Sequence, residues 1–89
     1  MISRTSKRFR RRLDQLPMDV QRQAREAYEL FRGDPSHPSL RFKRIHATRL
    51  VYSVRISSDY RALGVVAGGE VVWFWIGSHN EYEKLIAQL

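Results

Sequence analysis

The chain contains no cysteine, which excludes disulfides, thiolate metal sites and a cysteine nucleophile. Long apolar runs are also missing, since the longest, residues 71–77, is far shorter than a membrane span. The first residues, Met1 to Lys7, lack the apolar core of a secretory signal. We therefore expect a soluble, cytoplasmic protein without a membrane partner.

The remaining composition is that of a folded domain. The chain has 89 residues, of which 43% are hydrophobic, and it contains two Trp, four Tyr and four Phe residues. This apolar content exceeds that of disordered chains, and the length suits one domain with a small core. We expect a single domain over residues 1–89, without room for an elaborate catalytic apparatus.

Acidic side chains are scarce relative to basic ones. Sixteen Lys and Arg residues outweigh nine Asp and Glu residues, for a net charge of +7. Nine of the basic residues lie within residues 1–32. Such a balance favours a polyanionic partner, which RNA, DNA, anionic lipid or an acidic protein segment would satisfy.

Two helices are expected at the N-terminal end. Thr5 or Ser6 can cap a first helix that runs to about Leu16. A second helix is expected from Pro17 to Gly33. Their apolar stripes are Phe9, Leu13 and Leu16 in the first helix, and Val20, Ala24, Ala27, Tyr28 and Phe31 in the second. The two segments predict an antiparallel helical hairpin.

From residue 40 onward the apolar period changes to two. Strands are expected at residues 40–45, 50–56, 60–66 and 71–76. Gly68 and Gly69 predict a tight hairpin, since a primed two-residue turn requires positive φ at both positions. Ser78 and Glu81 match a capping box that begins a short last helix. The predicted fold is α+β, an N-terminal helical hairpin packed on a four-stranded antiparallel sheet with a short C-terminal helix.

The hairpin turn also predicts which residues lie opposite each other. It pairs Val66 with Val71, which places Arg61 opposite Ile76, and a three-residue loop would pair Arg55 with Arg61. The two arginines are then expected to face away from the helical hairpin, close to the last helix. The face toward the hairpin would carry Tyr52, Val54, Tyr60, Ala62, Gly64, Trp73 and Trp75.

Several segments taken together resemble the RelE/ParE toxin superfamily. They are Asp59-Tyr-Arg-Ala-Leu-Gly-Val, the Gly-Gly turn, Val71-Val-Trp-Phe-Trp-Ile-Gly77 and Ser78-His-Asn-Glu-Tyr82. The resemblance covers nearly the whole chain and implies a RelE-like fold. In the nuclease branch, basic residues before the central hairpin, an arginine like Arg61, and a C-terminal His or Arg followed by Tyr form the RNA site.

Metal-free RNA cleavage defines the roles that those residues would fill. The ribose 2′-OH attacks the adjacent phosphorus in line, and the departing 5′ oxygen is protonated. His79 is the best general acid, because imidazole titrates near neutrality. Arg61 can hold the phosphate and stabilise the charge of the transition state. Tyr82, three residues after His79, can stack a base or orient the phosphate.

The general base has the weakest support. Relatives use a carboxylate or a lysine in the second-strand region, where this chain has Lys43, Arg44 and His46 but no acid. Lys43 or His46 is therefore the candidate base, and Arg44, His46 and Arg55 are candidate RNA contacts. The basic first helix adds the candidate RNA contacts Arg8, Arg11 and Arg12. No cofactor and no metal ligand is expected.

Each candidate also has an ordinary structural interpretation. Arg61 and His79 can be solvated residues, Tyr82 can belong to the core, and the basic helix can be a solvated face. Trp73 and Trp75 are expected to be core residues rather than base-stacking ones. A basic amphipathic helix can also lie on a membrane, but here the narrow apolar stripe is needed by the core.

Three functions therefore compete. The first is a toxin of a type II toxin–antitoxin system that cuts mRNA as a metal-independent, ribosome-dependent endoribonuclease, with a cognate antitoxin as partner. The second is a ParE-like toxin that poisons DNA gyrase by binding. The third is a degenerate member that binds RNA without cutting it, which the missing carboxylate supports. The fold cannot decide among them, because the site carries the chemistry.

Overall fold

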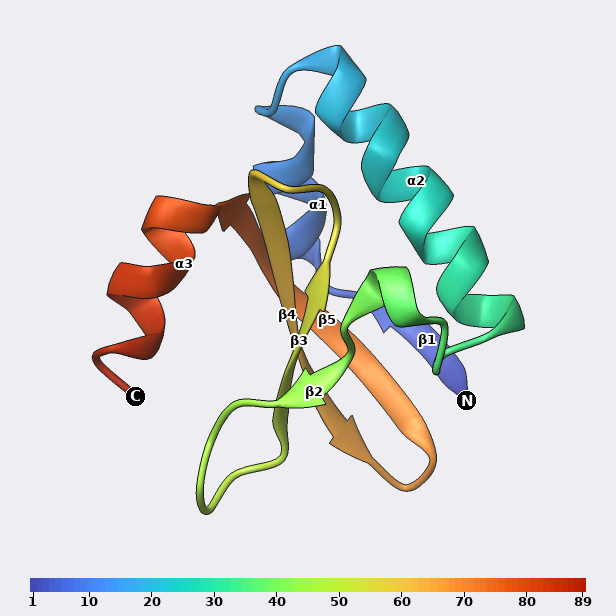
Figure 1. Ribbon diagram of the computed structural model, residues 1–89, viewed down its shortest axis with the longest axis vertical. Coiled ribbons are helices and arrows are strands. Elements are labelled where there is room, and N and C mark those ends of the chain that lie inside the picture. Colours follow the sequence, from blue (N-terminus) through green and yellow to red (C-terminus); the bar gives the residue numbers. More distant parts are fainter.

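The computed structural model describes residues 1–89 and has an α+β architecture (Figure 1). The strands are β1 (Ile2–Thr5), β2 (Lys43–Arg44), β3 (Val51–Arg55), β4 (Tyr60–Ala67) and β5 (Glu70–Ser78). The helices are α1 (Lys7–Asp14), α2 (Met18–Gly33) and α3 (His79–Ile86), and Pro38–Leu40 form a 3-10 turn. The strands make one sheet in the order β1-β5-β4-β3-β2. None of the helices is both long and apolar enough to cross a membrane.

The hairpin of α1 and α2 covers one face of the sheet, as the apolar stripes predict. Ser6 caps α1 by accepting a hydrogen bond from the Phe9 backbone N–H at 3.1 Å. α2 begins after Pro17, with Asp19 in its first turn near the positive end of the helix dipole. The main core between these layers consists of Phe9, Ala24, Ala27, Phe31, Leu40, Val54, Ala62, Val71, Trp73 and Ile76.

The N-terminal strand β1 is a fifth strand, one more than predicted. It runs parallel to β5, from Ile2 opposite Glu70 to Thr5 opposite Trp73. The Trp73 indole N–H donates to Ser3 Oγ at 2.8 Å, and this hydrogen bond links β1 to a core side chain of β5. Ile2 is the only apolar residue within β1, so no alternating pattern marks this strand in the sequence.

The strand expected at residues 40–45 is reduced to Lys43 and Arg44. The residues before it form the 3-10 turn, and Arg41 has a left-handed conformation with a φ of 46°. Such a residue interrupts a strand, because L residues rarely adopt positive φ outside turns. β2 is therefore a short edge strand beside β3.

The β4–β5 hairpin begins as the sequence predicts. Gly68 and Gly69 have φ values of 59° and 76°, and Val66 lies opposite Val71. These positive angles are those required by a primed two-residue turn, which only glycine adopts at low cost. The turn and the first pairs of the hairpin are therefore confirmed.

A β-bulge then shifts the register farther along the hairpin. The irregularity lies between Leu63 and Gly64, so β5 contributes one extra residue on its way to α3. Arg61 consequently lies opposite Gly77, and the prediction that it lies opposite Ile76 is wrong. The predicted pairing of Arg61 with residue 55 in β3 is confirmed.

The bulge also puts the two tryptophans on opposite faces of the sheet. Trp73 packs in the main core, where its ring covers Gly64 so closely that a Cβ there would lie 2.7 Å away. Trp75 packs instead with Leu63 and Tyr82 in a second core cluster under α3. Both tryptophans are buried as expected, but the prediction that Trp75 faces the helical hairpin is wrong.

Candidate functional site

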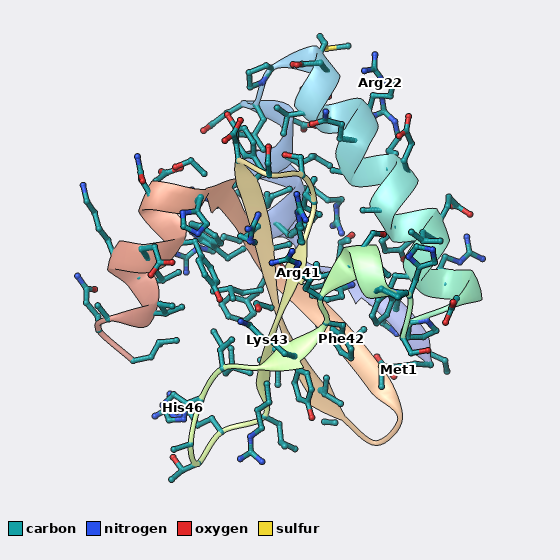
Figure 2. All side chains as sticks on the ribbon, viewed as in Figure 1. Met1, Arg22, Arg41, Phe42, Lys43 and His46 are labelled. Carbon is teal, nitrogen blue, oxygen red and sulfur yellow. The ribbon has the colours of Figure 1, made fainter.

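Basic side chains gather on the sheet face that lies on the α3 side. Lys43 lies opposite Ser53, which lies opposite Leu63, a member of the core cluster under α3. Arg55 follows Ser53 by two residues and Arg61 precedes Leu63 by two, so both project to the same side. Figure 2 shows Arg41 beside the strands, and Lys43 follows it by two residues in the chain. We call four residues the basic face: Arg41, Lys43, Arg55 and Arg61.

Arg61 is held within the basic face by the β3–β4 turn. Its Nη1 donates hydrogen bonds to the carbonyls of Ser57 at 2.5 Å and Tyr60 at 2.9 Å. Burial lowers the pKa of Arg61, and the positive charges of Arg55 and Arg41 lower it further. The guanidinium is thus fixed in place, partly desolvated and crowded by like charge. These conditions favour a bound anion.

The first turn of α3 brings His79 to the edge of this face. Ser78 and Glu81 form the predicted capping box, with the Ser78 hydroxyl accepting from the Glu81 N–H at 3.2 Å. The His79 backbone N–H donates to the Asp59 carbonyl at 2.7 Å, which ties α3 to the β3–β4 turn. The half-exposed His79 side chain opens into a polar pocket, whose other lining residues are Ser58, Asp59, Tyr60, Ser78 and Asn80.

Two further residues of α3 approach Arg61. Tyr82 is buried, and its ring centroid lies 6.1 Å from that of His79. Glu83 lies one helical turn after His79, with its Oε1 3.2 Å from His79 Nε2. Burial lowers the pKa of Arg61, whereas Tyr82 and Glu83 both raise it. The structure therefore brings together a guanidinium, an imidazole, a phenol and a carboxylate.

Arg44 and His46, by contrast, are not brought to this site. Arg44 lies opposite Tyr52, on the other face of the sheet, and its Nε donates to the carbonyls of His46 and Arg49 at 3.0 and 3.2 Å. His46 Nδ1 accepts two backbone N–H groups of the same loop, at 3.0 and 3.1 Å. Figure 2 shows His46 in that loop, well apart from Arg41. Both side chains shape the loop between β2 and β3.

The basic residues of α1 form a separate group, because α1 packs against β5 rather than β3. Arg12 is engaged in the fold, since its Nε donates to the Ile76 carbonyl at 2.7 Å and its Nη2 lies 3.5 Å from Glu81 Oε2. Arg8 and Arg11 are exposed. Of the three predicted RNA contacts in this helix, two are therefore free to meet a ligand and one supports the start of α3.

Two residues of the site were not predicted from the sequence. Arg41 lies outside β2 in a left-handed conformation, so no strand pattern marks it in the sequence. Glu83 follows His79 by four positions, which makes the two side chains neighbours on a helix. This spacing was the available signal for Glu83, which supplies near Arg61 the carboxylate that residues 40–46 lack.

Known proteins share this fold. The sequence profile of the ParE-like toxin domain family matches residues 18–84. A chain of the RelB–RelE antitoxin–toxin complex from Methanococcus jannaschii is similar in structure, with a TM-score of 0.74, 17% identity, and 92% of this chain and 96% of that chain covered. A copper-bound mutant toxin from Helicobacter pylori has a TM-score of 0.60 and 17% identity, with 91% and 97% covered. No curated protein matches the chain.

Proposed function

The chain belongs to the ParE-like toxin domain family of the RelE/ParE superfamily, and we propose that this toxin is a metal-independent endoribonuclease that cuts mRNA on the ribosome. One observation carries the proposal. Arg61, opposed by Arg55, lies under the turn of α3 that presents His79 and Tyr82. A fixed anion site next to a titratable group is what phosphodiester cleavage requires.

Each residue of the site has its own role in a 2′-OH attack. Nη1 of Arg61 is used by the β3–β4 turn, so Nη2 and Nε are left to hold a phosphate and the charge it gains in the transition state. His79 protonates the departing 5′ oxygen. Lys43, on the same face of the sheet, is the proposed base. Tyr82 is chiefly a core residue, and its hydroxyl orients the phosphate.

An antitoxin is the proposed protein partner. The solved chain from Methanococcus jannaschii comes from an antitoxin–toxin complex. In this chain, the net charge of +7 and the exposed apolar residues Leu50, Val65 and Val72 suit an acidic amphipathic segment. Such a segment would neutralise the positive charge and cover the apolar residues. Co-expression with each neighbouring small reading frame tests this, and failure of all of them to restore growth argues against an antitoxin.

DNA gyrase is the alternative target, because the matching family profile is that of the ParE-like toxin domain. A gyrase poison acts by binding and needs no proton transfer, so it would use the basic face without requiring the imidazole of His79. A non-catalytic RNA-binding protein would likewise keep its affinity without that group.

One experiment separates these functions. The protein is induced in bacteria, and both mRNA 5′ ends and DNA breaks are mapped. Cuts confined to translated frames are expected for the proposed nuclease, whereas breaks trapped on gyrase would replace it by the alternative. Growth arrest with neither product would point to RNA binding alone.

Variants of the site sharpen the result. His79→Ala and Arg61→Ala are each expected to relieve growth arrest while the protein remains folded, as judged by its thermal melt. Exposed Arg25→Ala on α2 is the control for loss of one positive charge. Full toxicity in both site variants would exclude this site as the nuclease centre.

A further inference from the structure

Glu83 and His79 form a side-chain pair on the exposed edge of α3. Glu83 Oε1 lies 3.2 Å from His79 Nε2, within hydrogen-bonding distance, and the two residues are four positions apart. Glu83 also contributes to the electrostatic environment of Arg61. The carboxylate is therefore paired with the imidazole and also acts electrostatically on the guanidinium of the proposed nuclease site.

We propose that Glu83 is a positioning residue for His79, which holds the Nε2–H so that Nδ1 is the atom that exchanges a proton with the RNA. This inference rests on the proposed nuclease function. A carboxylate that accepts from one imidazole nitrogen selects the tautomer and orients the ring. It also stabilises the imidazolium, the form of His79 that must be present before a general acid can act.

The proton balance of the step follows from this arrangement. The 2′ oxygen forms a bond to phosphorus, its proton passes to the Lys43 amine or to solvent water, and the bond from phosphorus to the 5′ oxygen breaks. The Nδ1 proton of the His79 imidazolium moves to the 5′ oxygen. The products are a 2′,3′-cyclic phosphate, a free 5′-hydroxyl and a neutral imidazole that still donates its Nε2–H to Glu83.

The backbone leaves His79 little freedom to take another position. Its own N–H is bound to the Asp59 carbonyl, and the capping box fixes the residue before it. The side chain itself is 44% exposed and that of Glu83 is 56% exposed. A pair so exposed adds little to the stability of the fold. Glu83 can therefore be replaced without the loss of structure that removal of a buried residue would cause.

Charged and titratable groups from three parts of the chain face His79. Glu83 and Tyr82 lie on α3, Asp59 lies in the β3–β4 turn, and Arg61 lies on β4. Among these groups, Glu83 is the one with a side-chain atom at hydrogen-bonding distance from the ring, so its removal should have a distinct effect.

The test uses the free toxin and nuclear magnetic resonance of the imidazole nitrogens. The neutral ring of the parent should be in the Nε2–H tautomer. In Glu83→Gln, the neutral ring should hold this tautomer less strictly, because a neutral amide is a weaker acceptor than a carboxylate. Glu29→Gln on α2 removes the same charge from another exposed pair and should leave His79 unchanged.

Cleavage of a ribosome-bound message provides the second readout. Glu83→Gln should cut more slowly than the parent at neutral pH. Glu83→Asp should restore part of the rate. An unchanged His79 tautomer in Glu83→Gln would overturn the inference. A parent that cuts no RNA, although its His79 responds to Glu83→Gln, would instead overturn the proposed nuclease function.

Discussion

Arg55 and Arg61 lie directly opposite each other across the β3–β4 ladder. Like charges in such a cross-strand pair destabilise a sheet. Burial, and then the charge of Arg55, lower the pKa of Arg61. The repulsion therefore acts on a guanidinium that is already partly desolvated. A bound phosphate would reverse this repulsion, which links the repulsion in the free protein to its proposed affinity for RNA.

Removal of Arg55 should therefore stabilise the fold and weaken RNA binding at the same time. For Arg55→Gln we expect the free energy of unfolding to rise by about 0.2 to 1 kcal/mol, because the repulsion across the strands is lost. Urea unfolding and RNA titration on the same samples measure the two effects. Arg25→Gln, an exposed change on α2, is the matched control. Lower stability in Arg55→Gln would contradict the repulsion between the two arginines.

Two variants of Tyr82 should separate its structural role from its chemical role. The ring is buried with Leu63 and Trp75, so Tyr82→Ala should cost about 3 kcal/mol or more and lower the melting temperature accordingly. Tyr82→Phe keeps the ring and should change stability by less than about 1.5 kcal/mol. A fall in the cleavage rate of Tyr82→Phe, with its melting temperature preserved, would assign a role to the hydroxyl. An unchanged rate would leave Tyr82 as a core residue.

Local signals explain why much of the fold could be predicted. The Gly68-Gly69 turn, the Ser78 capping box and the helical stripes each depend on residues a few positions apart. The pairing of Arg55 with Arg61 followed from a short loop. β1 could not be found in this way, because it has almost no apolar pattern and its partner lies nearly 70 residues away in the chain.

The errors in the predicted strand register arose because one β-bulge shifted the pairing of every residue beyond it. The bulge at Leu63 and Gly64 follows from how Trp73 packs over the glycine, a tertiary contact that no alternation reveals. It moved Trp75 to the α3 face and Arg61 to a position opposite residue 77. Arg12 was predicted to contact RNA from its charge, and its additional role in the fold could not be predicted, because the Ile76 carbonyl is available to it only where β1 ends beside β5.

The charge of Glu81 should stabilise the fold only above acidic pH. The hydrogen bond from the Ser78 backbone N–H lowers the pKa of Glu81 most, and the Ser78 hydroxyl hydrogen bond and the charge of Arg12 add to this effect against burial. Because the folded pKa lies below the unfolded one, the stabilisation is present above the unfolded value and is lost as the pH falls through the folded value.

Glu81→Gln tests this, since glutamine can keep the capping hydrogen bond without the charge. The parent should be more stable at pH 7 by less than about 1 kcal/mol, since the side chain is exposed and screened. The difference in urea unfolding between the two proteins should shrink as the pH falls below the ordinary glutamate pKa and disappear below the lowered pKa of the folded protein. A difference that does not change as the pH falls would mean that packing, rather than the carboxylate charge, is responsible.

The arginines of α1 should have different roles: Arg8 and Arg11 should bind phosphate, and Arg12 should support the fold. Arg8 and Arg11 are exposed, so their joint replacement by Gln should reduce the slope of log K against log salt for single-stranded RNA by about 1.4, or about 0.7 for each lost phosphate contact. Their replacement should leave the melting temperature unchanged, since neither side chain is needed by the core.

Arg12→Gln should lower the stability of the fold rather than the salt slope. Its Nε hydrogen bond to the Ile76 carbonyl and its position 4.9 Å from the Trp75 ring centroid hold the end of β5. Loss of that donor leaves a carbonyl without its partner, which should cost about 1 kcal/mol of unfolding free energy and change the salt slope little. A salt series and a thermal melt on all three proteins decide between these effects. Equal salt slopes in the parent and the Arg8/Arg11 double variant would make α1 a solvated face and leave RNA binding to the basic face beneath α3.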